Sequence, residues 1–290
     1  MNRSAQRIVV STVSTVRGRI AGAFAGLLIT IALAAPLHAD EAGREAFVAG
    51  DYEKALDIWQ PLAEDGDARA QFNVGLLYDE GLGVEKDPQQ ARQWWSKAAE
   101  QGLLAAGYNL ALLELEQAAS EDGEGDLETA LAHLRQTAEA GHLPARYTLG
   151  KVYQYGIGVE EDREAAFENI RLAAEGGFAK AQYNLGKAYR DGDGVEQDPE
   201  KAVEWFRRAA LRGHPGAQDH YARRLFTGEG VEKDPVQAMT FAVLAMRAGV
   251  DDAKELADDI RGELDISQLD EAFRAADGYA AAPPEQTATQ

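Results

Sequence analysis

The chain has 290 residues, of which 29 are basic and 49 acidic, for a formal net charge of −20, and it contains no cysteine. Such an acidic chain argues against nucleic-acid binding, which needs lysine and arginine to displace counterions, and against binding to anionic membranes. Without cysteine there is no disulfide framework and no thiol for a lipid anchor, so stability must come from packing.

The first 39 residues differ from the rest and are predicted to be a signal peptide. They contain four basic residues and no acid, then the apolar run Ile20–Ala35, and they end at the small residue Ala39 before Asp40. The apolar run has 16 residues, fewer than the roughly 20 that a membrane-spanning helix needs. We therefore expect cleavage after Ala39 and export to the periplasm or the medium, with an uncleaved anchor as the alternative.

The remaining sequence repeats itself with a nearly constant period. The related stretches AQFNVG, AGYNLA, ARYTLG and AQYNLG begin at Ala70, Ala106, Ala145 and Ala181, and weaker copies begin at Ala217 and Ala253. The spacings are 36, 39, 36, 36 and 36 residues. In each unit A-x-x-x-L-G-x-x-Y places its fixed residues along one helical stripe, and a second segment such as KAVEWFRRAALRG has an apolar helical face and ends in glycine. We predict about five stacked helix hairpins, which form an all-α superhelical solenoid.

The stretch DGDGVEQDPE (Asp191–Glu200) contains acids that could suggest a calcium loop. Both glycines, the valine and the last aspartate recur in four turns of the chain, whereas Asp191 and Asp193 do not. The recurring residues suit a turn, because glycine allows positive φ and Asp198 can cap the next helix. As an EF-hand the stretch fails at Glu196, where glycine is required, and no Gly-Lys-Ser/Thr follows for a phosphate loop. The sequence therefore predicts a helix-to-helix turn and no metal.

The whole pattern, A-x-x-x-L-G-x-x-Y-x-x-G-x-G-V-x-x-D-x-x-x-A-x-x-W, resembles the Sel-one-like repeat, a relative of the tetratricopeptide repeat (TPR). The resemblance extends from Ala68 to about Ala253. The second unit departs most, with Glu114 in place of tyrosine and a longer turn over Leu115–Asp126. The resemblance implies a right-handed α/α superhelix used as an adaptor. Exported members of this family in Gram-negative bacteria are commonly periplasmic interaction modules.

Pattern and resemblance together divide the chain into segments. After the signal peptide at 1–39, we expect a TPR-like N-terminal hairpin at 40–67 and the repeat solenoid at 68–252. Two capping helices are expected at 253–278 and a flexible tail at 279–290. Pro61 falls inside the second helix of the N-terminal hairpin and should kink it.

Residues typical of catalysis are scarce after the signal peptide. The three serines are Ser96, Ser120 and Ser267, and none belongs to a G-x-S-x-G or S-x-x-K motif. His142 and His214 occupy the same place after a repeat-ending glycine, which favours a loop role, and the spacing of His214 from His220 does not fit a zinc motif. We therefore predict no enzymatic activity, no cofactor and no metal. A cell-wall or β-lactam-processing hydrolase stays as the alternative.

The first helices of the repeats carry the candidate partner-binding residues. In related α-solenoids the first helix lines the concave groove, where aromatic anchors would concentrate binding energy. The four cations of the set would form a basic strip that suits an acidic or C-terminal carboxylate ligand. Packing of the same rings between repeats is the alternative. The predicted groove residues are Phe72, Leu76, Tyr108, Leu112, Tyr147, Lys151, Tyr183, Lys187, Arg190 and Arg223.

These observations predict a non-enzymatic periplasmic scaffold that binds a protein or peptide in the groove. It would bind no nucleic acid and would keep no membrane anchor after signal cleavage. Besides the hydrolase, a structural subunit of an envelope or exopolysaccharide assembly is the other alternative.

Overall fold

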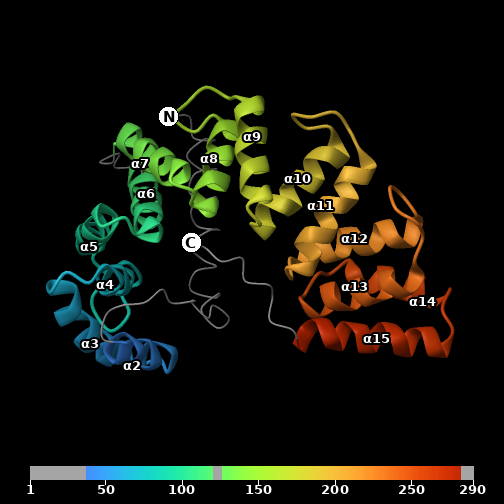
Figure 1. Cartoon of the computed structure of the whole chain (residues 1–290), viewed down its shortest axis with the longest axis horizontal. Coiled ribbons are helices and arrows are strands. Elements are labelled where there is room, and N and C mark those ends of the chain that lie inside the picture. Colours follow the sequence, from blue (N-terminus) through green and yellow to red (C-terminus); the bar gives the residue numbers. More distant parts are fainter. Residues whose placement is uncertain (1–36, 120–125, 282–290) are drawn as a thin grey trace. The chain divides into compact units, whose positions relative to one another are not determined.

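The computed structural model describes residues 37–119 and 126–281 (Figure 1). The predicted signal peptide lies outside the described residues except for its last three, which begin a helix. The described residues form fourteen helices and no strand, which confirms the all-α prediction. The chain divides into two compact units, Met1–Glu161 (unit 1) and Asp162–Gln290 (unit 2).

In unit 1 each helix packs against the next one along the chain. Helix α3 continues through Pro61, which lies on its exposed side. Its fully buried Ala55 faces the same core as Trp59. The helices are α2 (Leu37–Val48), α3 (Tyr52–Glu64), α4 (Ala68–Glu80), α5 (Pro88–Glu100), α6 (Leu104–Ala119), α7 (Leu127–Glu139) and α8 (Leu143–Tyr155).

Unit 2 repeats this arrangement and closes with two further helices that pack on α13. Helix α15 continues to Ala281, beyond the predicted end of the capping helices at residue 278. The reason is packing, because the ring of Tyr279 lies 5.5 Å from that of Phe241 in α13. The helices are α9 (Arg163–Glu175), α10 (Ala179–Asp191), α11 (Pro199–Leu211), α12 (Pro215–Thr227), α13 (Pro235–Arg247), α14 (Ala253–Arg261) and α15 (Ile266–Ala281).

The stretch DGDGVEQDPE forms the predicted turn. Gly192 ends α10 with φ 73°, a left-handed conformation that favours glycine. Asp198 caps α11 by accepting a hydrogen bond from the backbone N–H of Lys201 at 3.0 Å. The two acids that do not recur pair with arginines: Asp191 contacts Arg190 at 2.7 Å, and Asp193 contacts Arg163 at 3.8 Å. These acids are therefore ion-pair partners on the surface of unit 2.

A side-chain bond that the sequence did not reveal ties most first helices to the preceding hairpin. The residue after the first alanine of the repeat donates a hydrogen bond to a carbonyl near the end of the previous second helix. In the second repeat Gly107 has no side chain, and a Cβ added there would lie 2.8 Å from the hydroxyl of Thr137. The bonds run from Gln71 to Ala63 at 3.1 Å, Arg146 to Ala138 at 2.8 Å, Gln182 to Ala174 at 3.1 Å and Gln218 to Ala210 at 3.4 Å.

Candidate functional site

Four of the ten predicted groove residues are buried. Leu76, Tyr108, Leu112 and Tyr147 are only 1–7% exposed. The Tyr108 ring lies 4.9 Å from the ring of His142, at the start of α8, and its hydroxyl bonds to Thr148 Oγ1 at 2.9 Å. Burial raises the pKa of Tyr108 to about 12. These side chains therefore pack within unit 1 and offer no open surface to a partner. This agrees with the alternative that the rings pack between repeats.

The other six predicted residues are partly exposed, and four of them lie on α10 and α12 of unit 2. Phe72 and Lys151 belong to unit 1, where Lys151 Nζ donates to Gln154 Oε1 at 2.7 Å. The four residues of unit 2 are together called the Tyr183 face: Tyr183, Lys187, Arg190 and Arg223.

Tyr183 is the centre of a group of rings. His214 stacks on it with ring centroids 4.4 Å apart, and His220 lies 5.7 Å away at 26°. The fully buried ring of Phe206 stacks on His220 at 4.9 Å and so supports this imidazole from below. Burial, reinforced by the charge of Arg190, lowers the pKa of His220 to about 4. The group thus holds one partly exposed tyrosine ring against two imidazoles.

Two of the three cations of the Tyr183 face already bind carboxylates. Arg190 contacts Asp191, and Nε of Arg223 contacts Oδ2 of Asp219 at 2.9 Å. Within the described part of the chain, Lys187 has no carboxylate at ion-pair distance, and its Nζ lies 5.9 Å from the Tyr183 ring centroid. The basic strip that the sequence predicted is therefore largely neutralised, and Lys187 carries its uncompensated charge.

The sequence placed His142 and His214 in loops, and the structure gives both the same capping role. Nδ1 of His142 accepts a hydrogen bond from the backbone N–H of Ala145 at 3.3 Å, and Nδ1 of His214 accepts one from Ala217 at 3.2 Å. Each histidine is the N-cap of a first helix. This use of an imidazole nitrogen as an acceptor requires the neutral ring.

Acid is expected to destabilise unit 1 through His142. Burial lowers the pKa of His142 to about 4, whereas an unfolded histidine titrates near 6.5. Between these values the unfolded chain binds more protons, so the free energy of unfolding falls as the pH is lowered, by about 3 kcal/mol in total at about 1.4 kcal/mol per pH unit. His142→Asn keeps a capping oxygen without the titration and should flatten this part of the profile. Urea unfolding at several pH values measures it; identical profiles for both proteins would refute it.

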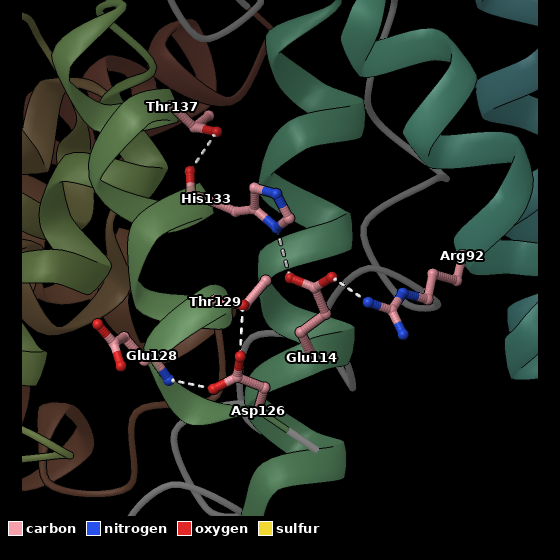
Figure 2. Close-up of polar contacts among 7 residues, drawn as sticks. All are labelled: Arg92, Glu114, Asp126, Glu128, Thr129, His133 and Thr137. Atoms are coloured by element: carbon pink, nitrogen blue, oxygen red, sulfur yellow. Dashed lines mark hydrogen bonds and ion pairs between the residues drawn. The ribbon is translucent and has the colours of Figure 1, made fainter. Parts of the chain in front are cut away.

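A second polar cluster lies in unit 1, around Glu114 of α6 (Figure 2). Oε1 of Glu114 accepts a bond from Nη2 of Arg92 in α5 at 3.1 Å, and Oε2 lies 2.6 Å from Nδ1 of His133 in α7. The Glu114 side chain is 5% exposed, against 44% for Arg92 and 36% for His133. One buried carboxylate thus joins three successive helices.

The three residues of this cluster stand at places that are mostly apolar in the other repeats. Two repeats further along the chain, Phe167 and Tyr189 stand at the places of Arg92 and Glu114, and their rings lie 6.1 Å apart. Sequence analysis identified Glu114 as a departure from the repeat but missed its partners, although Arg92 and His133 also replace residues that are mostly apolar in the other repeats. The place of Arg92 holds Leu131, Phe167, Val203 and Met239 elsewhere, and that of His133 holds Trp94, Asn169, Trp205 and Phe241.

A carboxylate that orients an imidazole is also a catalytic arrangement, but it needs a nucleophile. The two nearby hydroxyls are engaged elsewhere, as Figure 2 shows: Thr137 Oγ1 donates to the His133 carbonyl at 2.8 Å, and Thr129 Oγ1 donates to Asp126 Oδ2 at 2.6 Å. Among the described residues, no group of three or more His, Cys, Asp or Glu could hold a metal ion. The cluster fits a structural tie between α5, α6 and α7.

None of the helices in the described residues is long and apolar enough to cross a membrane.

The turn and hairpin pattern has relatives among characterised sequences. Five consecutive segments, 68–103, 105–142, 143–178, 179–214 and 215–250, match the Sel1 repeat. A sel1-like repeat-containing protein of Acanthamoeba polyphaga mimivirus is 29% identical over 101 residues, which cover 35% of this chain and 18% of that protein. An F-box protein of Arabidopsis thaliana is 37% identical over 73 residues, covering 25% and 20%. The chain therefore spans no more than a fifth of these relatives.

Solved structures agree with the fold. A protective antigen of uropathogenic Escherichia coli strains with an SLR fold is 30% identical with a TM-score of 0.67, covering 86% of this chain and 54% of that one. A Sel1 repeat protein from Oxalobacter formigenes is 29% identical, also with a TM-score of 0.67, covering 83% and 98%. Since the matched repeats also occupy more than half of the 290 residues, the chain belongs to the Sel1 repeat family.

Proposed function

We propose that the chain is a non-enzymatic adaptor that binds a protein or peptide through the Tyr183 face of unit 2. Sel1 repeats generally mediate protein–protein interactions and are typically non-enzymatic scaffolds. The observation that carries the proposal is the partly exposed Tyr183 ring, held between His214 and His220 beside the uncompensated Lys187. A rigid aromatic ring next to a charge is the kind of group that dominates binding energy at interfaces.

The Tyr183 face is preferred over the predicted tyrosines of unit 1 because of exposure. Tyr108 and Tyr147 are buried, so a partner could reach them only if unit 1 unpacked. Tyr183 keeps part of its ring open while its other contacts hold it in place. Less ordering is then needed when a partner binds, which favours affinity.

Replacing Tyr183 by alanine is expected to lower partner capture about tenfold or more, because the main aromatic anchor is lost. A photo-crosslinking amino acid in place of the exposed Gln197, whose side chain contacts the Arg190 carbonyl, leaves the Tyr183 face intact and would capture the partner in cells. Mass spectrometry would measure the yield. Two controls are available: the crosslinker at Glu204, exposed on second helix α11, and Tyr155→Ala, which removes an exposed ring from unit 1. Equal yields from positions 197 and 204, or an unchanged yield in Tyr183→Ala, would reject the Tyr183 face.

We further propose that this binding takes place outside the cytoplasm. The support is the basic start, the apolar run Ile20–Ala35 and the small residue Ala39. The mass of the protein recovered from the periplasm should correspond to a chain that begins at Asp40. Recovery of the uncut chain in the membrane fraction would favour the anchor instead.

A further inference from the structure

The contact between Arg190 and Asp191 has the form of a ligand contact. Nε and Nη2 of Arg190 donate to Oδ1 and Oδ2 of Asp191 at 2.7 and 2.8 Å. This two-point geometry is the one by which arginine recognises a free carboxylate group. The pair is specific to this repeat: the corresponding pairs in the other turns are Asp79 and Glu80, Gln154 and Tyr155, and Phe226 and Thr227.

The arginine is held in place by more than this aspartate. Its Nη1 lies 3.4 Å from Nε2 of His220, which accepts on the opposite edge of the guanidinium. His220 is itself stacked between Tyr183 and Phe206. The edge that faces Asp191 would therefore stay in position if Asp191 moved away.

Asp191 is also easy to displace. The Arg190 and Asp191 side chains are 28% and 48% exposed, and exposed ion pairs contribute little to stability. Lys187 lies one helical turn before Arg190 on α10, so both cations share one side of the helix. A carboxylate arriving from solvent would meet both of them.

We propose that Lys187 and Arg190 form a carboxylate-binding site of the Tyr183 face, which Asp191 occupies in the free chain as an internal competitor of the partner. This inference rests on the proposed function and names the chemistry that the partner must present. The carboxylate can come from an acidic side chain or from a C-terminus. On binding, it replaces Asp191 on the Nε/Nη2 edge of Arg190 and gains the ammonium group of Lys187.

The charges around the site predict the direction in which Asp191→Asn changes the affinity for a carboxylate. Asp191 contacts Arg190 directly and is also within the electrostatic reach of Lys187. Asp191→Asn removes one negative charge beside these two cations and frees the guanidinium edge. The substitution should therefore strengthen binding, whereas loss of a residue that merely shapes the turn would weaken it or leave it unchanged.

Fluorescence anisotropy of the purified exported protein tests the site with three labelled octapeptides. One is oligoglutamate with an amidated C-terminus, one is Gly-Ser with a free C-terminus, and one is amidated Gly-Ser. Asp191→Asn should tighten binding of a carboxylate peptide about three- to fivefold, the most that an exposed pair allows, and Lys187→Gln should weaken it. Whichever carboxylate peptide responds identifies the source, and the amidated Gly-Ser peptide should not respond.

Asp193→Asn is the matched control, because it removes the same charge from the same turn but from a residue that contacts Arg163. It should change affinity less than about 1.5-fold, as expected for screened surface charge. Equal effects at 191 and 193, no effect at 191, or no binding of either carboxylate peptide would overturn the site. Crosslinking from position 197 separates failure of this site from failure of the proposed function: a partner that is captured with the same yield in Asp191→Asn would leave the adaptor role intact.

Discussion

Arg92→Leu alone is expected to lower the free energy of unfolding of unit 1 by about 2–3 kcal/mol. Removing one partner from a buried ion pair typically costs about 3–5 kcal/mol, because the other charge stays buried without compensation. Arg92 is partly exposed, which allows water to compensate Glu114 in part, and the lower figure follows from that. His133 alone then faces the carboxylate. Urea unfolding followed by circular dichroism measures the loss.

Arg92→Leu should no longer lower the free energy of unfolding when Glu114 and His133 are replaced as well. Arg92→Leu, Glu114→Tyr and His133→Trp together restore residue types that the other repeats hold at these places. Replacing a buried charged group by well-packed apolar residues is commonly neutral or stabilising by about 1–4 kcal/mol. The triple variant should therefore be at least as stable as the natural protein, although one of its three changes is destabilising alone.

Arg135→Leu provides the control for these measurements, since Arg135 lies on α7 outside the cluster. Its effect should stay within about 0.5 kcal/mol, as for most surface positions. A triple variant that is less stable than Arg92→Leu would mean that the polar cluster fits this repeat better than the ring contacts do. It would also mean that the departure at Glu114 is a requirement of local packing.

The helix hairpins could be predicted from the sequence because their signals are local. The stripe Ala181, Leu185, Tyr189 lies within one helix, and the residues that end α10 and begin α11 lie within ten positions of each other. Repetition then strengthened the interpretation, since Asp191 and Asp193 could be separated from the recurring turn residues by comparison alone. The turn has the predicted form for this reason.

The exposure of the candidate site could not be predicted in this way. Tyr108 and Tyr183 occupy the same place in their repeats, yet the first is buried and the second partly open. The difference comes from neighbours in other helices, such as Thr148, which bonds the Tyr108 hydroxyl from 40 positions away. The partners of Glu114 were missed for the same reason, because Arg92 and His133 lie 22 and 19 positions from it. A polar residue at an apolar place of the repeat is the signal that would have found them.

Phe206→Ala is expected to destabilise unit 2 by about 3–5 kcal/mol, the usual cost of removing a buried phenylalanine ring. Phe206 is fully buried and packs directly on Gly186: a Cβ added to that glycine would lie 2.7 Å from Cδ1 of the ring. For this reason Gly186→Ala should also destabilise the natural protein, by about 1–3 kcal/mol, although alanine favours helices over glycine by about 1 kcal/mol.

The two changes should not be additive. Without the Phe206 ring the two nearest contacts of the added methyl group are gone and the next is the Ala202 carbonyl at 3.2 Å, so Gly186→Ala should turn from destabilising to neutral or slightly stabilising. Hydrogen exchange of α10–α12 amides locates the effect, and Gly278→Ala, where a Cβ meets nothing within 4 Å, reports the helix preference alone. If the losses in the free energy of unfolding from Phe206→Ala and Gly186→Ala simply add, the Phe206 ring does not pack on Gly186 in solution. His220 would then lack the support that holds the Tyr183 face, and capture through Tyr183 should fail for the same reason.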